Sequence, residues 1–232
     1  MISMTRRKKS NLKKYFLFFI LLIAGFIFFE NKRFQNRLNN IYLQKKLAGE
    51  NIQKTNVRNI FFSITEAEYI LYFINYNGIE KKIPNLEKIG EINFSTPILI
   101  KKNKYGYVDK NGEIIIPLEY SEATEFKDGI AAVKKYKYGV INQNGSILLP
   151  FEYDQIYVGE NKKIILKKDG KYYTSNLKSA KEIDFDDLVE LTTGQLFFKK
   201  GDEYGVIDIN GKILIKNTSL ESQKFYYNIK TQ

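Results

Sequence analysis

Two hydrophobic patterns divide the chain. Residues 15–29 form an unbroken apolar run, YFLFFILLIAGFIFF. From about residue 61 onward, apolar residues come in short runs that are separated by turn-forming pairs such as Asn-Gly. Short apolar runs between turn signals are typical of β-strands joined by hairpins. The pattern therefore predicts one hydrophobic helix followed by a β domain over residues 61–232.

The apolar run predicts a single transmembrane helix. As a helix, residues 15–29 span about 22 Å, which is somewhat short of the ~30 Å hydrocarbon layer. Lysines at both ends, Lys13, Lys14 and Lys32, can reach the two interfaces. A cleavable signal peptide has an apolar stretch of similar length. The run ends in Phe28-Phe29-Glu30, without the small residues of a cleavage site, so a retained anchor is favoured over cleavage.

Charge predicts how this anchor is oriented. The chain has 37 basic and 26 acidic residues, and six of the basic residues, with no acidic one, lie in residues 1–14. Positive charge is retained in the cytoplasm, so residues 1–14 are expected to be a cytoplasmic tail and the β domain to be extracytoplasmic. Residues 30–60 read as a juxtamembrane linker, either a short amphipathic helix or a polar segment.

The β domain repeats itself with a period of about 33 residues. Prolines recur at 84, 117 and 150, and lysine pairs at 101–102, 134–135, 167–168 and 199–200. Asn-Gly recurs at 77–78, 111–112, 144–145 and 210–211, and a tyrosine follows each lysine pair at 105, 138, 172 and 204. A fixed period of this length is the signature of stacked supersecondary units, of which at least three are needed for stability.

The sequence of each repeat unit predicts β-strands joined by a turn. Tyr105 to Pro117 contains two strand-like runs around a turn at Asn111-Gly112, and Pro117 is expected to close the second strand because it lacks an amide donor. A third strand follows at Ile130–Val133. The unbroken run Ile114–Ile116 predicts cover on both faces of its strand. The predicted fold is all-β: four to five three-stranded antiparallel meanders, either as an open array or as a closed propeller.

The unit resembles the WG, or KWG, repeat family of bacterial tandem β-repeats. Its family signature is represented by these structural positions: Tyr105, Gly106, Asn111, Gly112, Pro117, Tyr138, Gly139, Asn144, Gly145, Pro150, Tyr204, Gly205, Asn210 and Gly211. Tyrosine replaces the family's tryptophan throughout. The unit beginning at Tyr172 departs further, since it has Tyr173 in place of glycine and lacks the proline. The resemblance implies a binding or scaffolding role and supplies no catalytic residue.

Composition narrows the possible chemistry. The chain has no cysteine and no histidine, which excludes disulfides, thiolate metal sites and the usual neutral-pH general base. No catalytic residue, metal ligand or cofactor site is therefore assigned. The acidic stretch Asp184–Asp187 lacks the pattern of a calcium loop and reads as solvated. Lys102, Lys135, Lys168 and Lys200 are a speculative binding ladder for an anionic ligand, with solubility of the strand edges as the alternative explanation.

The sequence thus predicts a membrane-anchored, non-catalytic binding or scaffold module. Its partner is expected to be a protein or a cell-envelope glycan. Nucleic acid is not expected, because over half of the excess positive charge lies in the N-terminal tail. The alternative is a hydrolase of envelope polymers that uses the recurring carboxylates Glu119 and Glu152. The oligomeric state is left open.

Overall fold

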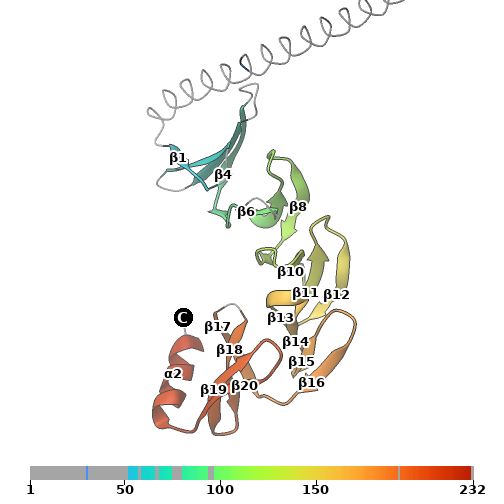
Figure 1. Cartoon of the computed structure of the whole chain (residues 1–232), viewed down its shortest axis with the longest axis vertical. Coiled ribbons are helices and arrows are strands. Elements are labelled where there is room, and N and C mark those ends of the chain that lie inside the picture. Colours follow the sequence, from blue (N-terminus) through green and yellow to red (C-terminus); the bar gives the residue numbers. More distant parts are fainter. Residues whose placement is uncertain are drawn as a thin grey trace, which may run out of the picture.

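A computed structural model describes residues 30, 52–56, 59–65, 68–74, 80–93, 97–192 and 194–230. These residues form five four-stranded antiparallel sheets and one C-terminal helix, which confirms the all-β fold. The sheets follow one another in a curved row whose two ends do not meet (Figure 1), so this is an open arc. No helix among the described residues is both long and apolar enough to cross a membrane. The predicted tail and anchor, residues 1–29, lie outside the described residues.

The strands of every sheet are in chain order. The first sheet contains β1 (Ile52–Lys54), β2 (Ile60–Ile64), β3 (Tyr69–Ile74) and β4 (Glu80–Leu86); the second contains β5 (Lys88–Ile89), β6 (Ile98–Lys102), β7 (Lys104–Val108) and β8 (Ile114–Tyr120). The third contains β9 (Glu122–Ala123), β10 (Ile130–Lys134), β11 (Tyr138–Asn142) and β12 (Ile147–Tyr153).

The fourth sheet contains β13 (Gln155–Val158), β14 (Ile164–Lys168), β15 (Lys171–Ser175) and β16 (Ala180–Ile183), with a 3-10 turn at Glu160–Lys162. The fifth contains β17 (Asp187–Thr192), β18 (Gln195–Lys200), β19 (Glu203–Asp208) and β20 (Ile213–Asn217), and α2 (Leu220–Lys230) follows it. The first strand begins at Ile52, inside the range that was expected to be a linker.

The three-stranded meander is wrong in two respects. Each sheet has a fourth strand, which is as short as two residues in β5 and β9. The predicted third strand, β10, does not pair with the hairpin that precedes it in the chain. It pairs with β9 and β11 and belongs to the next sheet. A unit read from tyrosine to tyrosine therefore spans two sheets.

The core lies between successive sheets. Separate clusters of buried apolar side chains join the first sheet to the second, the second to the third, the third to the fourth and the fourth to the fifth. The second strand of each of the last four sheets is buried on both faces, as in β10, where Ile130, Ala131, Ala132 and Val133 are at most 1% exposed. Because each sheet covers its neighbour, a single sheet could not bury these side chains alone.

The last sheet is covered by α2 instead of by another sheet. Tyr226 from the helix is buried with Phe197 and Tyr204 of the fifth sheet, and Ile229 packs beside them. Figure 1 shows the helix alongside this sheet at the end of the row. A terminal element that covers an apolar face is what a stacked array requires for solubility, so α2 acts as a cap.

The outer strands overturn the expectation that the run at Ile114–Ile116 is covered on both faces, and the equivalent runs at Ile147–Leu149 and Ile213–Ile215 behave in the same way. These runs lie on the outermost strands β8, β12 and β20, and most of their side chains are exposed, as Ile115 (40%) and Ile147 (60%) illustrate. Pro117 does not close its strand either, since β8 continues to Tyr120. Proline is tolerated there because an edge strand has no outer partner for its amide.

Candidate functional site

The tyrosine-glycine signature lies where the third strand of a sheet passes its outer strand. A β-carbon on Gly106 would lie 2.7–2.9 Å from three backbone atoms of β8, and one on Gly139 would lie 2.9 Å from the Leu149 carbonyl oxygen. In the second and third sheets the pairing is irregular at this point, so the outer strand bulges over the glycine. In the fifth sheet, a β-carbon on Gly205 would lie still closer to the carbonyl oxygen of Ile215. The signature glycines are therefore structural.

The Asn-Gly pairs at 111–112, 144–145 and 210–211 form the predicted hairpin turns, and the pair at 77–78 lies outside the described residues. Gly112, Gly145 and Gly211 have φ of +78° to +79°, the left-handed conformation that favours glycine. The Asp109 carboxylate accepts hydrogen bonds from the Asn111 and Glu113 amides at 2.9 and 2.8 Å, as predicted for the turn entry. The companion residues Asn111, Asn144 and Asn210 have no positive φ. Only the glycine of each pair is required by backbone geometry.

In the second and third sheets, the first lysine of the lysine pair lies over the signature tyrosine. The Lys101 ammonium lies 5.6 Å from the Tyr105 ring centre, and Lys134 lies 5.0 Å from that of Tyr138. Tyr138 also donates a hydrogen bond to the Glu122 carboxylate. Burial and that carboxylate together raise the pKa of Tyr138. This arrangement orders side chains at the start of the hairpin, where the rings of Tyr105 and Tyr138 also pack against core clusters.

The second lysines, which form the speculative ladder, tie neighbouring sheets together. Lys135 is 3.0 Å from Glu119, Lys168 is 2.9 Å from Glu152, and Lys200 is 2.6 Å from Asp184. In each pair the carboxylate comes from one sheet, or the loop just after it, and the lysine from the next. Lys102 is exposed, and no ion pair involving it occurs among the described residues. Each of these three lysines therefore has its positive charge offset locally by a neighbouring carboxylate.

The same ion pairs account for the recurring carboxylates Glu119 and Glu152. Each is on the outer strand of a different sheet, and each faces a lysine of the following sheet. Lys135 also lies 5.5 Å from the Tyr120 ring centre and 5.4 Å from that of Phe151. Two carboxylates that act together on a glycosidic bond must face one cleft. The structure brings these two to lysines and aromatic rings instead.

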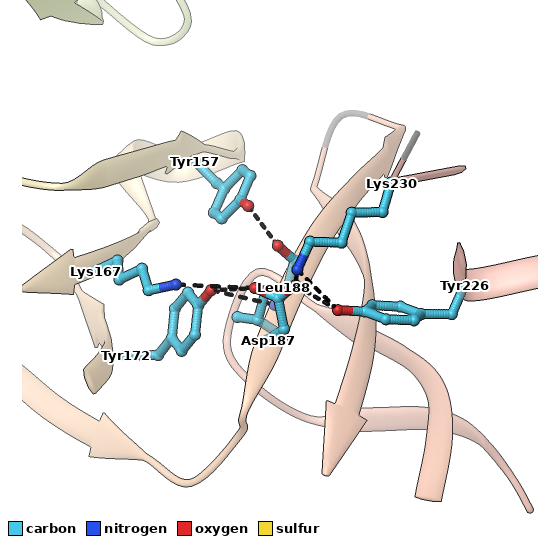
Figure 2. Close-up of polar contacts among 7 residues, drawn as sticks. All are labelled: Tyr157, Lys167, Tyr172, Asp187, Leu188, Tyr226 and Lys230. Carbon is cyan, nitrogen blue, oxygen red and sulfur yellow. Dashed lines mark hydrogen bonds and ion pairs between the residues drawn. The ribbon is translucent and has the colours of Figure 1, made fainter. Parts of the chain in front are cut away.

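The Asp187 carboxylate contacts side chains of both the fourth sheet and α2 (Figure 2). Its carboxylate accepts hydrogen bonds from Tyr172 of the fourth sheet at 3.0 Å and from Tyr226 and Lys230 of α2 at 2.5 and 2.6 Å. Lys167 is 3.8 Å away. Burial alone would raise the pKa of Asp187, but the hydrogen bonds outweigh it and hold the pKa below its ordinary value.

A second set of bonds surrounds this carboxylate. The Tyr157 hydroxyl donates to the Leu188 carbonyl at 2.7 Å, and the Leu188 amide donates to the Tyr172 oxygen at 3.2 Å. We call the set comprising Tyr157, Lys167, Tyr172, Asp187, Leu188, Tyr226 and Lys230 the Asp187 junction. It joins the fourth sheet, the fifth sheet and the capping helix. The sequence predicted a solvated loop here, which is wrong for Asp187.

The other acids of that loop are more exposed. Asp186 accepts a hydrogen bond from the Gly201 amide at 2.6 Å, and the Asp184 side chain is 86% exposed. Among the described residues, no group of three or more acidic side chains is arranged to hold a metal ion. The Asp187 junction has the geometry of a structural clasp, because its hydrogen bonds join the fourth sheet and α2 to the first strand of the fifth sheet.

Comparison with known proteins identifies part of the chain. No curated protein matches it. Among solved structures it is similar to Kluyveromyces lactis Hsv2, at 8% identity over 68% of this chain and 59% of that chain, with a TM-score of 0.45. A eukaryotic initiation factor is 12% identical, over 72% of this chain and 54% of that chain, with a TM-score of 0.46. The hemopexin fold protein CP4 from cow pea is 11% identical, over 77% of this chain and 96% of that chain, with a TM-score of 0.24.

This chain thus spans less than two thirds of the Hsv2 and initiation-factor chains. The family model described as "WG containing repeat" matches residues 105–137 and 138–172. Both matches begin at the tyrosine of a Tyr-Gly pair, in the register read from the sequence. Residues 105–172 are accordingly two tandem repeats of the WG repeat family.

Proposed function

We propose that this protein is a non-catalytic binding module whose outer strands contact a protein partner. The observation that carries the proposal is the set of exposed aliphatic side chains at equivalent positions of three sheets. They are Ile114 and Ile115 on β8, Ile147 and Leu148 on β12, and Ile213, Leu214 and Ile215 on β20, with exposed fractions from 39% to 60%. We call these the outer aliphatic rows.

Exposed aliphatic side chains that recur in this way favour a binding role. Single exposed apolar residues are normal on a protein surface, whereas repeated clusters mark interaction sites. The rows recur with the repeat, so a partner would contact several sheets and its affinity would be distributed among them. Aliphatic side chains favour a protein partner over a glycan, because a glycan is bound mainly through hydrogen bonds and aromatic faces.

The carboxylate chemistry supports a binder over a hydrolase. Glu119 and Glu152 are neutralised by Lys135 and Lys168 on separate sheets. We further propose that residues 15–29 hold the module at a membrane with the β domain outside the cytoplasm. The support for this location is the apolar run with the basic tail that precedes it.

Site-specific photo-crosslinking in cells tests the binding surface. A photoreactive amino acid is placed at Ile115, Leu148 or Leu214, and at Glu182 on the outer strand of the fourth sheet as the control. The proposal expects the same crosslinked partner from the three aliphatic positions and none from Glu182. Equal crosslinking from all four positions, or none from the aliphatic rows, would count against a specific surface on the outer strands.

A further inference from the structure

A pocket of about 440 Å³ lies between the hairpin of the fourth sheet and the turn of the fifth. Its walls come from the β15–β16 hairpin, from the turn after β19 and from the residue before β14. The residues lining it are Lys163, Thr174, Ser175, Asn176, Ser179, Ala180, Lys181, Ile209 and Asn210. This pocket is separate from the outer aliphatic rows and from the Asp187 junction.

The pocket coincides with the place where the repeat pattern is lost. Two positions after the signature tyrosine, the second, third and fifth sheets have Tyr107, Val140 and Val206, whereas the fourth has Thr174. One position further on, the corresponding residues are Val108, Ile141, Ile207 and, in the fourth sheet, Ser175. The fourth sheet thus has a small hydroxyl side chain at two positions that hold aliphatic residues or, at Tyr107, an aromatic residue in the other three.

The facing strand shows the same change. Residues Ile116, Leu149 and Ile215 pair with the first of these positions in the other three sheets, and Lys181 takes their place in the fourth. Ala180 likewise pairs with Ser175, where the other sheets have isoleucine. Random loss of the repeat would scatter such changes over the unit. Here they are gathered on one hairpin around one cavity.

Local geometry accounts for the open space. The turns of the second, third and fifth sheets close with an amide-to-carbonyl bond across five residues, for example from Asn142 to Ser146. The fourth closes across four, from Asn176 to Ser179, and its strands β15 and β16 pair without a bulge. The shorter hairpin and the small side chain of Ala180 leave open space at this end of the fourth sheet.

The other wall is fixed in place. The Ile209 side chain packs on Gly159 so closely that a β-carbon there would lie 2.5 Å from Ile209 Cγ1. The turn glycine Gly211 rests against the fourth sheet, since a β-carbon on it would lie 3.1 Å from Ile183 and 3.2 Å from Thr174. Ile209 and the turn that follows it are therefore held closely against the fourth sheet.

The charge of the lining selects an anion. Lys163 and Lys181 are the charged side chains of the lining, and no acidic residue lines it. Neither lysine forms an ion pair with an acidic side chain within the described part of the chain, unlike the lysines of the ladder.

We propose that this pocket binds a small polar molecule through a phosphate-type oxyanion. Lys163 and Lys181 hold the oxyanion, and the hydroxyl and amide groups of the hairpin contact the rest of the molecule. Charge-assisted hydrogen bonds from two lysines suit an oxyanion, and the volume leaves space for a group about as large as a sugar ring. This inference goes beyond the proposed function, since it assigns a second site with its own ligand chemistry.

Titration calorimetry on the full chain in detergent tests the site. Three probes separate the sources of the oxyanion: inorganic phosphate, glucose 6-phosphate, and glycerophosphoglycerol as a lipid headgroup without acyl chains. We expect saturable binding that weakens with added salt, and tighter binding of at least one organic probe than of phosphate. The double variant Lys163→Gln/Lys181→Gln should lose about tenfold or more in affinity.

Two further variants make the test specific. The control Lys162→Gln/Lys178→Gln removes the same charge from neighbouring exposed positions that do not line the pocket, and it should keep the affinity. The variant Thr174→Val/Lys181→Leu restores the apolar pattern of the other sheets, so it should stay folded and lose binding. No saturable binding of any probe, or equal loss in both lysine variants, would overturn the site. Neither result bears on crosslinking at the outer rows, so the two proposals fail separately.

Discussion

Replacing Asp187 with asparagine should loosen the C-terminal cap. Asparagine retains one oxygen that can accept from Tyr172, but its amide nitrogen cannot accept from Tyr226 or Lys230. Two charge-assisted hydrogen bonds at ~1.5 kcal/mol each give a loss of about 3 kcal/mol. The remaining bond between Lys230 and the Tyr226 oxygen, at 3.1 Å, stays within α2 and does not hold the helix to the sheet.

Hydrogen exchange of the α2 backbone amides measures this loss directly. A stacked array can open at one end without unfolding elsewhere, so a global unfolding midpoint would dilute the effect. Since each 1.4 kcal/mol is a factor of ten, protection in α2 should fall by about a hundredfold. Amides of the second sheet should keep their protection, because the Asp187 junction does not reach them.

The matched control is Asp184→Asn in the same loop. Asp184 is 86% exposed and pairs with Lys200, so its loss should cost about 0–1 kcal/mol. Adding Lys230→Met to Asp187→Asn should cause little further loss, because the partner is already gone. If Asp184→Asn and Asp187→Asn lowered the exchange protection of α2 equally, the Asp187 junction would not be what holds the helix. The same conclusion would follow if Asp187→Asn left the protection of α2 unchanged.

Three other outcomes follow from the structure, and a fourth follows from the apolar run in the sequence. Acid should open the Asp187 junction, because folding lowers the pKa of Asp187. Its contribution to stability is therefore fully present above the ordinary pKa of about 3.9 and is lost as the pH falls through the folded-state pKa. Hydrogen exchange of the α2 amides measured against pH would show this loss, and Asp187→Asn would abolish the pH dependence. Gly106→Ala should destabilise the array by about 1–3 kcal/mol in thermal denaturation, whereas Asn144→Ala in an exposed turn should be near neutral. Lys135→Gln and Lys168→Gln should each cost about 0–1 kcal/mol in urea, and a larger cost would mean that the ladder is more than a set of surface ties. The full chain should remain in the membrane pellet after an alkaline wash, and a soluble product lacking residues 15–29 would contradict the anchor.

The repeat, its turns and its family could be predicted because they depend on local chemistry. A glycine at positive φ and an aspartate at the turn entry leave a signal within a few residues, as in Asp109–Gly112. The sequence contains no such local signal for the offset by which each tyrosine-to-tyrosine unit spans two sheets. The two residues of β9 are too few to show an alternation, and pairing of β10 with the following hairpin is decided by tertiary packing.

The predicted burial was wrong for one of two apolar runs that look alike in the sequence. Ile114–Ile116 and Ile130–Val133 are both unbroken apolar runs, yet the first is largely exposed on an outer strand and the second is buried. Binary patterning cannot separate them. The Asp187 junction was also beyond the sequence, because its partners Tyr226 and Lys230 lie 39 and 43 residues away. What the sequence did hold was the break in the pattern after Tyr172, which is where the pocket lies.

The half-sheet offset of the repeat bears on how such a chain can change its length. The unit 105–137 supplies β7 and β8 to the second sheet and β9 and β10 to the third. Excising it would join Lys104 to Tyr138, so that β5 and β6 would be followed directly by β11 and β12. Those four strands make a complete sheet with a Tyr-Gly pair in its usual place. Gain or loss of one unit in the gene would therefore lengthen or shorten the arc by one whole sheet and leave no strand unpaired.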